Sequence, residues 1–110
     1  MDDDLRLFGS AARTRVLLAI ALLEQSYPRE IARVARVPLM SAQRIVNDLE
    51  AQRIVASRTR GNQREVRLNP TFFAQKELRA LLLQLSAGDP ALVREIESLR
   101  RRPRRAGKEL

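Results

Sequence analysis

The chain has 110 residues, of which 45% are hydrophobic and 4% aromatic, so one domain with an aliphatic core is expected. Because it contains neither cysteine nor histidine, disulfides, thiolate or imidazole metal sites and catalysis by these side chains are excluded. A formal net charge of +8, carried almost entirely by arginine, is typical of proteins that bind nucleic acid or an anionic membrane, although arginine-rich codon usage produces the same bias.

Residues 1–9 begin with an acidic run and are expected to form a flexible arm. An acidic start is atypical of a secretory signal. The longest apolar run, from Val16 to Leu23, is much shorter than the roughly 20 residues that cross a bilayer. We therefore expect a cytoplasmic protein that does not enter a membrane.

A first helix is predicted over residues 11–25, with Ser10 as a suitable N-cap. Its apolar residues surround the helix almost completely instead of forming one stripe, so the helix must be buried on more than one side. In a domain of this size the second side is expected to lie against another subunit. Burial within a single chain is the alternative.

Two helices joined by a tight turn are predicted next. Pro28 fits the first position of a short helix over residues 28–35. Residues 36–38 form the turn, because the proline at its end cannot continue a helix but can begin one. The second helix, 39–52, has an inner apolar stripe and a polar outer face. The stripe consists of Ala42, Ile45, Val46 and Leu49, and the outer face of Ser41, Gln43, Arg44, Asn47 and Asp48.

A β-hairpin is predicted after these helices. Its strands are expected over residues 54–58 and 65–68, since residues 59–64 between them contain the Gly-Asn sequence of a tight turn. The hairpin is rich in arginine. These arginines could bind DNA, or they could only keep an exposed hairpin soluble.

Two further helices are predicted over residues 71–86 and 90–101. Asp89 is a suitable N-cap for the second of them, and Pro90 fits its first position. The basic segment 102–110 is expected to be a disordered tail. The apolar face of the helix over residues 71–86 consists of Phe72, Phe73, Leu78, Leu81, Leu82 and Leu85.

A short helix, a tight turn, an amphipathic helix and an arginine-rich hairpin, in this order, indicate a helix-turn-helix with a basic wing that binds double-stranded DNA. In the major groove, Arg44 could bind guanine with its forked guanidinium, and Gln43 and Asn47 could each form two hydrogen bonds with adenine. Ser41, near the start of the helix, could bind a phosphate or a base edge. The alternative is an ordinary solvated helix face.

The other basic residues would contact phosphates, or the minor groove in the case of the wing, without specifying a sequence. They are Arg58, Arg60 and Arg64 in the wing, residues 58–65, and Arg29 and Arg33 in the helix over 28–35.

From Leu7 to Leu85 the chain resembles winged helix-turn-helix transcriptional regulators of the ArsR and MarR type in the order, spacing and apolar positions of its elements. The resemblance implies a mainly α fold with a small β-hairpin, in which residues 39–52 are the recognition helix. It also implies a homodimer joined through the first and last helices, here 11–25 and 71–86. The family's DNA-facing positions fall on Met40, Ser41, Gln43, Arg44 and Asn47, and its basic wing positions on Arg58, Arg60 and Arg64.

The resulting domain organisation is a winged helix-turn-helix over residues 10–70 and a helical dimerisation extension over 71–101. The chain departs from the family pattern at the turns before and after the recognition helix, where Arg36 and Arg53 replace the usual glycines. The lack of cysteine and histidine excludes the metal-sensing branch of the family.

The recognition helix itself begins with Pro38, Leu39 and Met40, where the family has small polar residues. Either these apolar side chains touch thymine methyl groups, or this surface binds a protein. Two alternatives to a sequence-specific regulator follow. One is a protein-interaction module, for example with a nucleotidyltransferase-like partner, since the stretch ELRALLLQL resembles a subgroup found beside such domains. The other is a non-specific nucleic-acid binder.

Overall fold

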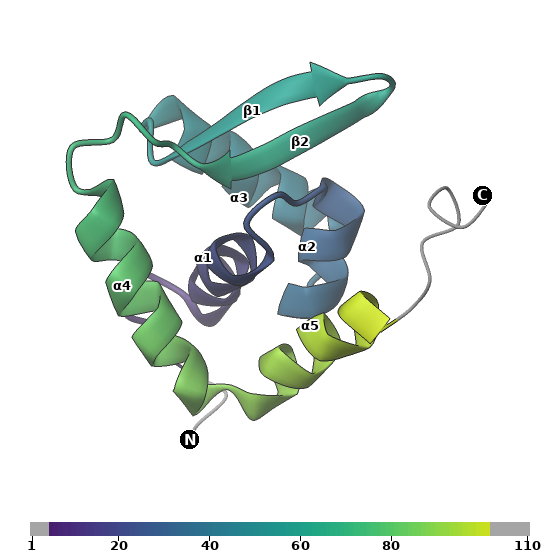
Figure 1. The fold of residues 1–110 in the computed structure, drawn as a ribbon, viewed down its shortest axis with the longest axis vertical. Helices are drawn as coiled ribbons and strands as arrows, with labels where there is room; N and C mark the ends of the chain where they lie inside the picture. Colours follow the sequence, from purple (N-terminus) through teal and green to yellow (C-terminus); the bar gives the residue numbers. More distant parts are fainter. Residues whose placement is uncertain (1–4, 102–110) are drawn as a thin grey trace.

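The computed structural model describes residues 5–101, so residues 1–4 of the expected arm and the expected tail, 102–110, lie outside the described part. Within that part, helices and one antiparallel hairpin form the mainly α fold that the sequence predicted (Figure 1). The elements are α1 (Ala11–Leu23), α2 (Pro28–Ala35), α3 (Leu39–Ala51), β1 (Val55–Arg60), β2 (Gln63–Leu68), α4 (Gln75–Leu85), the short 3-10 helix η1 (Ser86–Gly88) and α5 (Pro90–Arg101).

Helix α1 lies at the centre of the fold (Figure 1). The hydroxyl of Ser10 caps it by accepting a hydrogen bond from the N–H of Arg13 at 3.0 Å. Every residue from Val16 to Ala21 is at most 2% exposed. The helix contacts α2, α3, α4, α5 and β2, so elements of the same chain cover its apolar surface.

The expectation that another subunit covers the second side of α1 is therefore wrong. Helix α5 packs against both α1 and α2, and its Leu92 and Ile96 join the common core with exposures of 0% and 4%. Arg100 of α5 also donates a hydrogen bond to the carbonyl of Leu22 at 3.0 Å. The apolar face of α5 thus covers the side of α1 that was expected to lie against another subunit.

In the turns before and after α3, one residue adopts the left-handed backbone conformation, although in both turns this residue is an arginine and not a glycine. Arg36, the C-cap of α2, has φ 59° and ψ 47°, and Arg53 after α3 has φ 65°. A side-chain-bearing residue in this conformation costs roughly 1–2 kcal/mol. Arg36 is held in place by a salt bridge to Asp89 at 3.1 Å. The two arginines thus adopt the backbone shape for which glycine is usually selected.

The hairpin is longer than the sequence predicted, because its turn contains only two residues. Arg60 pairs with Gln63 directly before and after that turn. Gly61 has φ 61°, as the first central residue of a type II′ turn requires. At the other edge of β2, Ser26 forms a single antiparallel bridge with Val66 and attaches the hairpin to the start of the helix-turn-helix.

Helix α4 begins at Gln75, four residues later than predicted. Asn69 explains the delay, because its side-chain oxygen accepts a hydrogen bond from the N–H of Thr71 at 3.0 Å. Its carbonyl accepts a second one from the N–H of Phe72 at 3.1 Å. These bonds hold residues 69–72 in a turn, so α4 starts only after it.

The side chains of α4 divide between the core and the surface. Leu82 is 0% exposed, whereas Leu81 and Leu83 are 40% and 39% exposed. Replacement of Leu82 would therefore test folding, and only the outer leucines can test association with another molecule.

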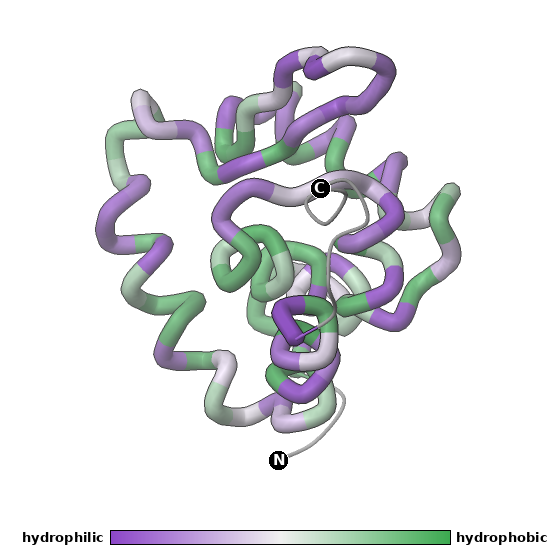
Figure 2. Tube along the Cα trace, turned by 45° about the vertical axis from the view of Figure 1, so that its right-hand side comes forward, coloured by the Kyte–Doolittle hydropathy of each residue, from purple (hydrophilic) through white to green (hydrophobic). Residues whose placement is uncertain are grey.

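Hydropathy follows the same division along the chain, with a hydrophobic α1 and a hydrophilic hairpin tip (Figure 2). Among the described residues, none of the helices combines the length and the apolar character that a membrane crossing requires.

Candidate nucleic-acid interface

The outer face of α3 presents polar side chains that have no internal partner. Gln43, Arg44 and Asn47 are exposed, and none of them forms a hydrogen bond or ion pair with another described residue. Together with Met40, which is 74% exposed, they follow the three- and four-residue spacing of one helix face. Ser41 lies beside them and is half-buried. The structure thus brings the five predicted α3 residues to one surface.

Packing of the opposite face fixes this orientation. Ala42, Val46 and Leu49 are 0% exposed, and α3 contacts α1, α2 and β1. Asp48, at the edge of the outer face, forms a salt bridge with Arg13 of α1 at 2.6 Å. These contacts hold α3 rigidly against the domain.

The two apolar residues at the start of α3 have different environments. Leu39 is half-buried and packs against the core, whereas Met40 is exposed. Only Met40 is therefore fully available to another molecule.

All three predicted wing arginines form ion pairs with glutamates of the same chain. The Nε of Arg58 lies 2.7 Å from Oε1 of Glu65, and Nη1 of Arg60 lies 3.5 Å from Oε2 of the same carboxylate. The register places Arg58 directly opposite Glu65. Arg64 binds Glu50 at the end of α3. The wing is thus basic in sequence but carries its own counter-charges.

Glu65 is only 1% exposed although it lies on the side of the hairpin opposite to the buried Val66. The hydrogen bond from Arg58 and the nearby charges of Arg60 and Arg67 lower its pKa, outweighing the rise caused by burial. Its Oε2 atom has no hydrogen-bond partner in the described chain. The carboxylate is therefore ionised at neutral pH and attracts the surrounding guanidinium groups.

Glu50 links α3 to the hairpin. It accepts hydrogen bonds from the guanidinium of Arg64 and from the hydroxyl of Ser57, the latter at 2.8 Å. Desolvation raises the pKa of Glu50, but these two hydrogen bonds and the charge of Arg64 outweigh it, and the net result is a lowered pKa. The link fixes the position of the wing relative to α3.

The two arginines of α2 have different surroundings. Arg33 forms a salt bridge with Glu95 of α5 at 3.2 Å. Arg29 is exposed and has no ion-pair partner in the described part of the chain. Arg29 lines a hollow of about 480 Å³ between α2, α3 and the wing tip, together with Gln43 and Asn62. Of the two, Arg29 is the one that the fold brings to the α3 surface.

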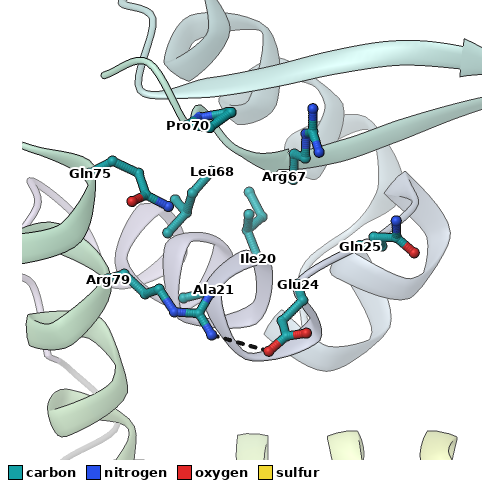
Figure 3. Close-up of a pocket in the computed structure, with 9 residues that line it drawn as sticks. All are labelled: Ile20, Ala21, Glu24, Gln25, Arg67, Leu68, Pro70, Gln75 and Arg79. Atoms are coloured by element: carbon teal, nitrogen blue, oxygen red, sulfur yellow. Dashed lines mark hydrogen bonds and ion pairs between the residues drawn. The ribbon is translucent and has the colours of Figure 1, made fainter. Parts of the chain in front are cut away.

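A second hollow, of about 410 Å³, lies where α1 and β2 end and α4 begins (Figure 3). Glu24 is the one carboxylate that lines it, and this group is ion-paired with Arg79 at 3.1 Å. Elsewhere in residues 5–101, no three acidic, histidine or cysteine side chains come together as a metal site would require. Among the residues that line this hollow, Glu24 thus has an arginine as its partner and no second carboxylate beside it.

Sequence reasoning missed Glu50 and Glu65 as parts of the site. A signal for Glu65 was present, because strands ending at Arg58 and starting at Glu65 place these residues opposite each other in a hairpin. No comparable signal existed for Glu50. Its pairing with Arg64 depends on how the hairpin lies across the end of α3.

Comparison with known proteins shows a likeness in structure only. The sequence matches no protein-family profile and no curated protein sequence. The chain is similar to the crystal structure of a MarR family transcriptional regulator from Silicibacter pomeroyi DSS-3, with a TM-score of 0.53 and 23% identity over 80% of this chain. It spans 60% of the length of that regulator. The likeness and the order of elements show that the chain has the winged helix-turn-helix fold.

Proposed function

We propose that the chain is a non-catalytic regulator that binds a specific sequence of double-stranded DNA as a homodimer. The main support is the outer face of α3, where Gln43, Arg44 and Asn47 are exposed and lack partners in the described chain. Unpaired polar groups on a rigidly packed helix are available to form hydrogen bonds with base edges. The net charge of +8 adds a general attraction to phosphates.

In this proposal α3 lies in the major groove. Arg44 binds guanine through two hydrogen bonds, and Gln43 and Asn47 bind adenine in the same way. Met40 touches a thymine methyl group, and Ser41 binds a phosphate or a base edge near the start of the helix. Each good bidentate pair discriminates against the wrong base by about 1–3 kcal/mol.

The backbone contacts come from α2 and the wing. Arg29 lies beside α3 with no ion-pair partner in the described chain and is the strongest candidate for a phosphate contact. Arg58 binds Glu65 through Nε, so its terminal nitrogens remain available to a phosphate. Arg33 is held by Glu95 and contributes less. These contacts position the protein without specifying sequence.

A homodimer would present two copies of α3 to the same side of the duplex. Related by a two-fold axis, the two helices would enter successive turns of the major groove, roughly 34 Å apart. The binding site is then expected to be palindromic, with half-sites one helical turn apart.

The experiment that tests this function is selection of bound sequences from a random duplex pool at about 0.15 M salt, which partly screens electrostatic attraction. We expect enrichment of a two-fold symmetric motif. Salt-sensitive binding without enrichment would instead establish a non-specific binder. Absence of binding would overturn the proposal.

A second candidate function is a protein-interaction module that uses the start of α3. The observation that favours it is that Met40 is 74% exposed, while the wing arginines already have carboxylate partners. This function predicts that Met40→Asp abolishes binding of the partner, while DNA affinity is weak in both the wild-type chain and the variant.

A further inference from the structure

A hollow of about 350 Å³ lies between the end of α3 and the segment that joins β2 to α4. That segment lies at the end of the hairpin opposite to its tip (Figure 1). The hollow is therefore separate from the one that Arg29 lines beside the wing tip. Its lining consists of Gln52, Arg53, Asn69, Thr71, Phe72 and Phe73.

Arg53 is one of three described residues other than glycine that have a positive φ, together with Glu24 and Arg36. Glu24 is paired with Arg79 of α4 at 3.1 Å. Arg36 is paired with Asp89, directly before α5, at the same distance. Arg53 has φ 65° but is exposed, and its side chain forms no hydrogen bond or ion pair with another described residue. A conformation that favours glycine is thus kept by an arginine whose guanidinium the described fold does not use.

A second side chain at this hollow is also unused by the fold. Phe73 is 93% exposed, and its ring centroid lies 5.0 Å from that of the half-buried Phe72. Aromatic residues and arginine are enriched at protein interfaces and supply many of the residues that dominate binding. An exposed phenyl ring and an unpaired guanidinium at one hollow therefore indicate a binding surface.

The segment that carries Phe73 is attached to the end of α3. Nδ2 of Asn69 donates a hydrogen bond to the carbonyl of Arg53 at 2.9 Å, and the N–H of Asn69 donates one to the carbonyl of Ile54 at 3.0 Å. Oδ1 of Asn69 accepts hydrogen bonds from the N–H and the hydroxyl of Thr71 at 3.0 and 2.9 Å. These bonds preform the hollow, which lowers the entropic cost of binding.

We propose that this surface binds a segment of another protein in which a carboxylate lies beside a large apolar side chain. We call it the Arg53–Phe73 surface, and it consists of Arg53, Thr71, Phe72 and Phe73. The carboxylate pairs with Arg53, and the apolar side chain packs against Phe73 and enters the hollow. The inference adds a protein contact to the proposed DNA-binding function and does not depend on a dimer.

The lining favours a protein segment over a nucleic acid. Arg53 is the one charged residue among the residues that line the hollow. The side-chain amide of Gln52 already donates a hydrogen bond to Asp48 at 3.0 Å, and that of Asn69 donates one to a backbone carbonyl. A nucleic-acid strand carries a phosphate at every nucleotide and is bound by grooves with many positive charges. One guanidinium beside an aromatic ring instead matches one carboxylate beside an apolar group.

The Arg53–Phe73 surface also lies apart from the residues that would read bases. A recognition helix contacts base edges mainly through its N-terminal residues. Arg53 comes two residues after Ala51, the last residue of α3. A rise of 1.5 Å per residue places Ala51 roughly 10 Å beyond Arg44 along the helix. We therefore expect the protein segment to bind while α3 lies in the major groove.

The first test is selection from a random library of short peptides displayed on phage, with the full chain as the immobilised target. Phage that bind the double variant Arg53→Gly/Phe73→Ser are removed beforehand. We expect the recovered peptides to share an aspartate or glutamate beside a large apolar residue. Recovery of no peptide, or of peptides that lack an acidic residue, would overturn the proposal.

The second test measures the affinity of a recovered peptide, made synthetically with a fluorescent label, by anisotropy. Arg53→Gly and Phe73→Ser should each weaken binding by about ten-fold or more. Arg53→Lys keeps the charge and should restore part of the affinity. The controls are Arg94→Ala, an exposed arginine of α5, and Met40→Ser, an exposed apolar residue of α3. Equal weakening by the controls would contradict the proposed surface.

Thermal melting separates a binding role of Arg53 from a structural one. Glycine adopts a positive φ without strain, so Arg53→Gly should melt at or above the temperature of the wild-type chain while binding the peptide less tightly. A lower melting temperature together with weaker binding would show that Arg53 acts through the fold, and would overturn its assignment as a carboxylate-binding residue.

The last test adds random-sequence duplex DNA or single-stranded DNA to the complex of the chain with the labelled peptide. We expect neither to displace the peptide. Displacement by either DNA, absent from Phe73→Ser, would show that the surface binds nucleic acid and would overturn the proposal. Failure here leaves the sequence specificity of α3 untouched, because selection from the random duplex pool measures that property separately.

Discussion

The two halves of the candidate DNA surface, α3 and the wing, are both polar and exposed but differ in how their charges are held. On α3, Gln43, Arg44 and Asn47 have no partner in the described chain. In the wing, each of the three predicted arginines is already paired with a carboxylate. Arg58 and Arg60 are paired with Glu65, and Arg64 is paired with Glu50. The free groups lie on the element that would read bases, and the paired groups on the element that would contact phosphates.

This difference has a physical consequence for binding. Unpaired groups on α3 gain their hydrogen bonds only when a matching base is present, which favours sequence specificity. Paired arginines must share or leave a carboxylate to bind a phosphate, which weakens attraction to any DNA. We therefore expect α3 to dominate the specific affinity and the wing to contribute less than its arginine content suggests.

The largest effect is expected for Arg44→Ala. Loss of a bidentate contact to guanine should weaken binding to the selected sequence by about 1–3 kcal/mol, or roughly 5- to 150-fold, and change binding to random duplex only slightly. Titration of both duplexes at one salt concentration measures this. The matched control is Arg94→Ala, an exposed arginine of α5 without a partner in residues 5–101. Equal weakening on both duplexes would show that Arg44 contacts only the backbone.

A smaller and different effect is expected for Arg60→Ala. Its loss should weaken binding to all sequences together and make the plot of log affinity against log salt shallower by about 0.9, the value for one phosphate contact. The reduction in affinity should be smaller than for Arg44→Ala, since Glu65 lies 3.5 Å from this guanidinium in the free protein. A change confined to the selected sequence would show that the wing reads bases.

The contrast between α3 and the wing was only half visible in the sequence. The three- and four-residue spacing of Ala42, Val46 and Leu49 fixed the outer face of α3 in advance, because helix geometry is local. The bounds of α2 and α5 also agree with the prediction, since a proline marks each start. The pairing of Arg64 with Glu50 is tertiary, and no local pattern specifies it.

The environment of α1 was not predictable for a similar reason. Its apolar circumference required a second covering surface, but the sequence pattern does not distinguish a partner subunit from α5 of the same chain. The ion pairs of Arg33 with Glu95 and of Arg36 with Asp89 attach α5 to α2 and to the following turn. These contacts join residues more than 50 positions apart, which only the folded chain brings together.

Glu65→Gln should make the wing more like α3, because it removes the carboxylate that pairs with two of the wing arginines. The amide keeps the size of the side chain but removes its charge, which releases Arg58 and Arg60. We expect a few-fold increase in affinity for all sequences and a salt dependence steeper by about 0.9 if one more phosphate contact forms. Glu97→Gln, an exposed carboxylate of α5, controls for the change in net charge.

A double-mutant cycle sharpens this test. If Glu65 restrains Arg60, the loss caused by Arg60→Ala should be greater in the Glu65→Gln background than in the wild-type chain. Equal losses in both backgrounds would show that the carboxylate does not compete with DNA for this arginine. Weaker binding by Glu65→Gln alone would show that Glu65 chiefly orients the wing.

The smallest effect is expected in the pH dependence of stability. The pKa values of Glu50 and Glu65 are lowered from 4.5 in the folded chain, so their ion pairs stabilise the fold above pH 4.5, and this stabilisation is lost as the pH falls through the folded-state pKa. The wild-type chain should therefore melt slightly above Glu65→Gln at pH 7, and the difference should vanish in acid. Thermal melting of both proteins between pH 3 and pH 7 measures it, and carboxylates common to both cancel in the difference. A constant difference would mean that Glu65 contributes packing and not charge. The wing would then lack the internal counter-charge that distinguishes it from α3.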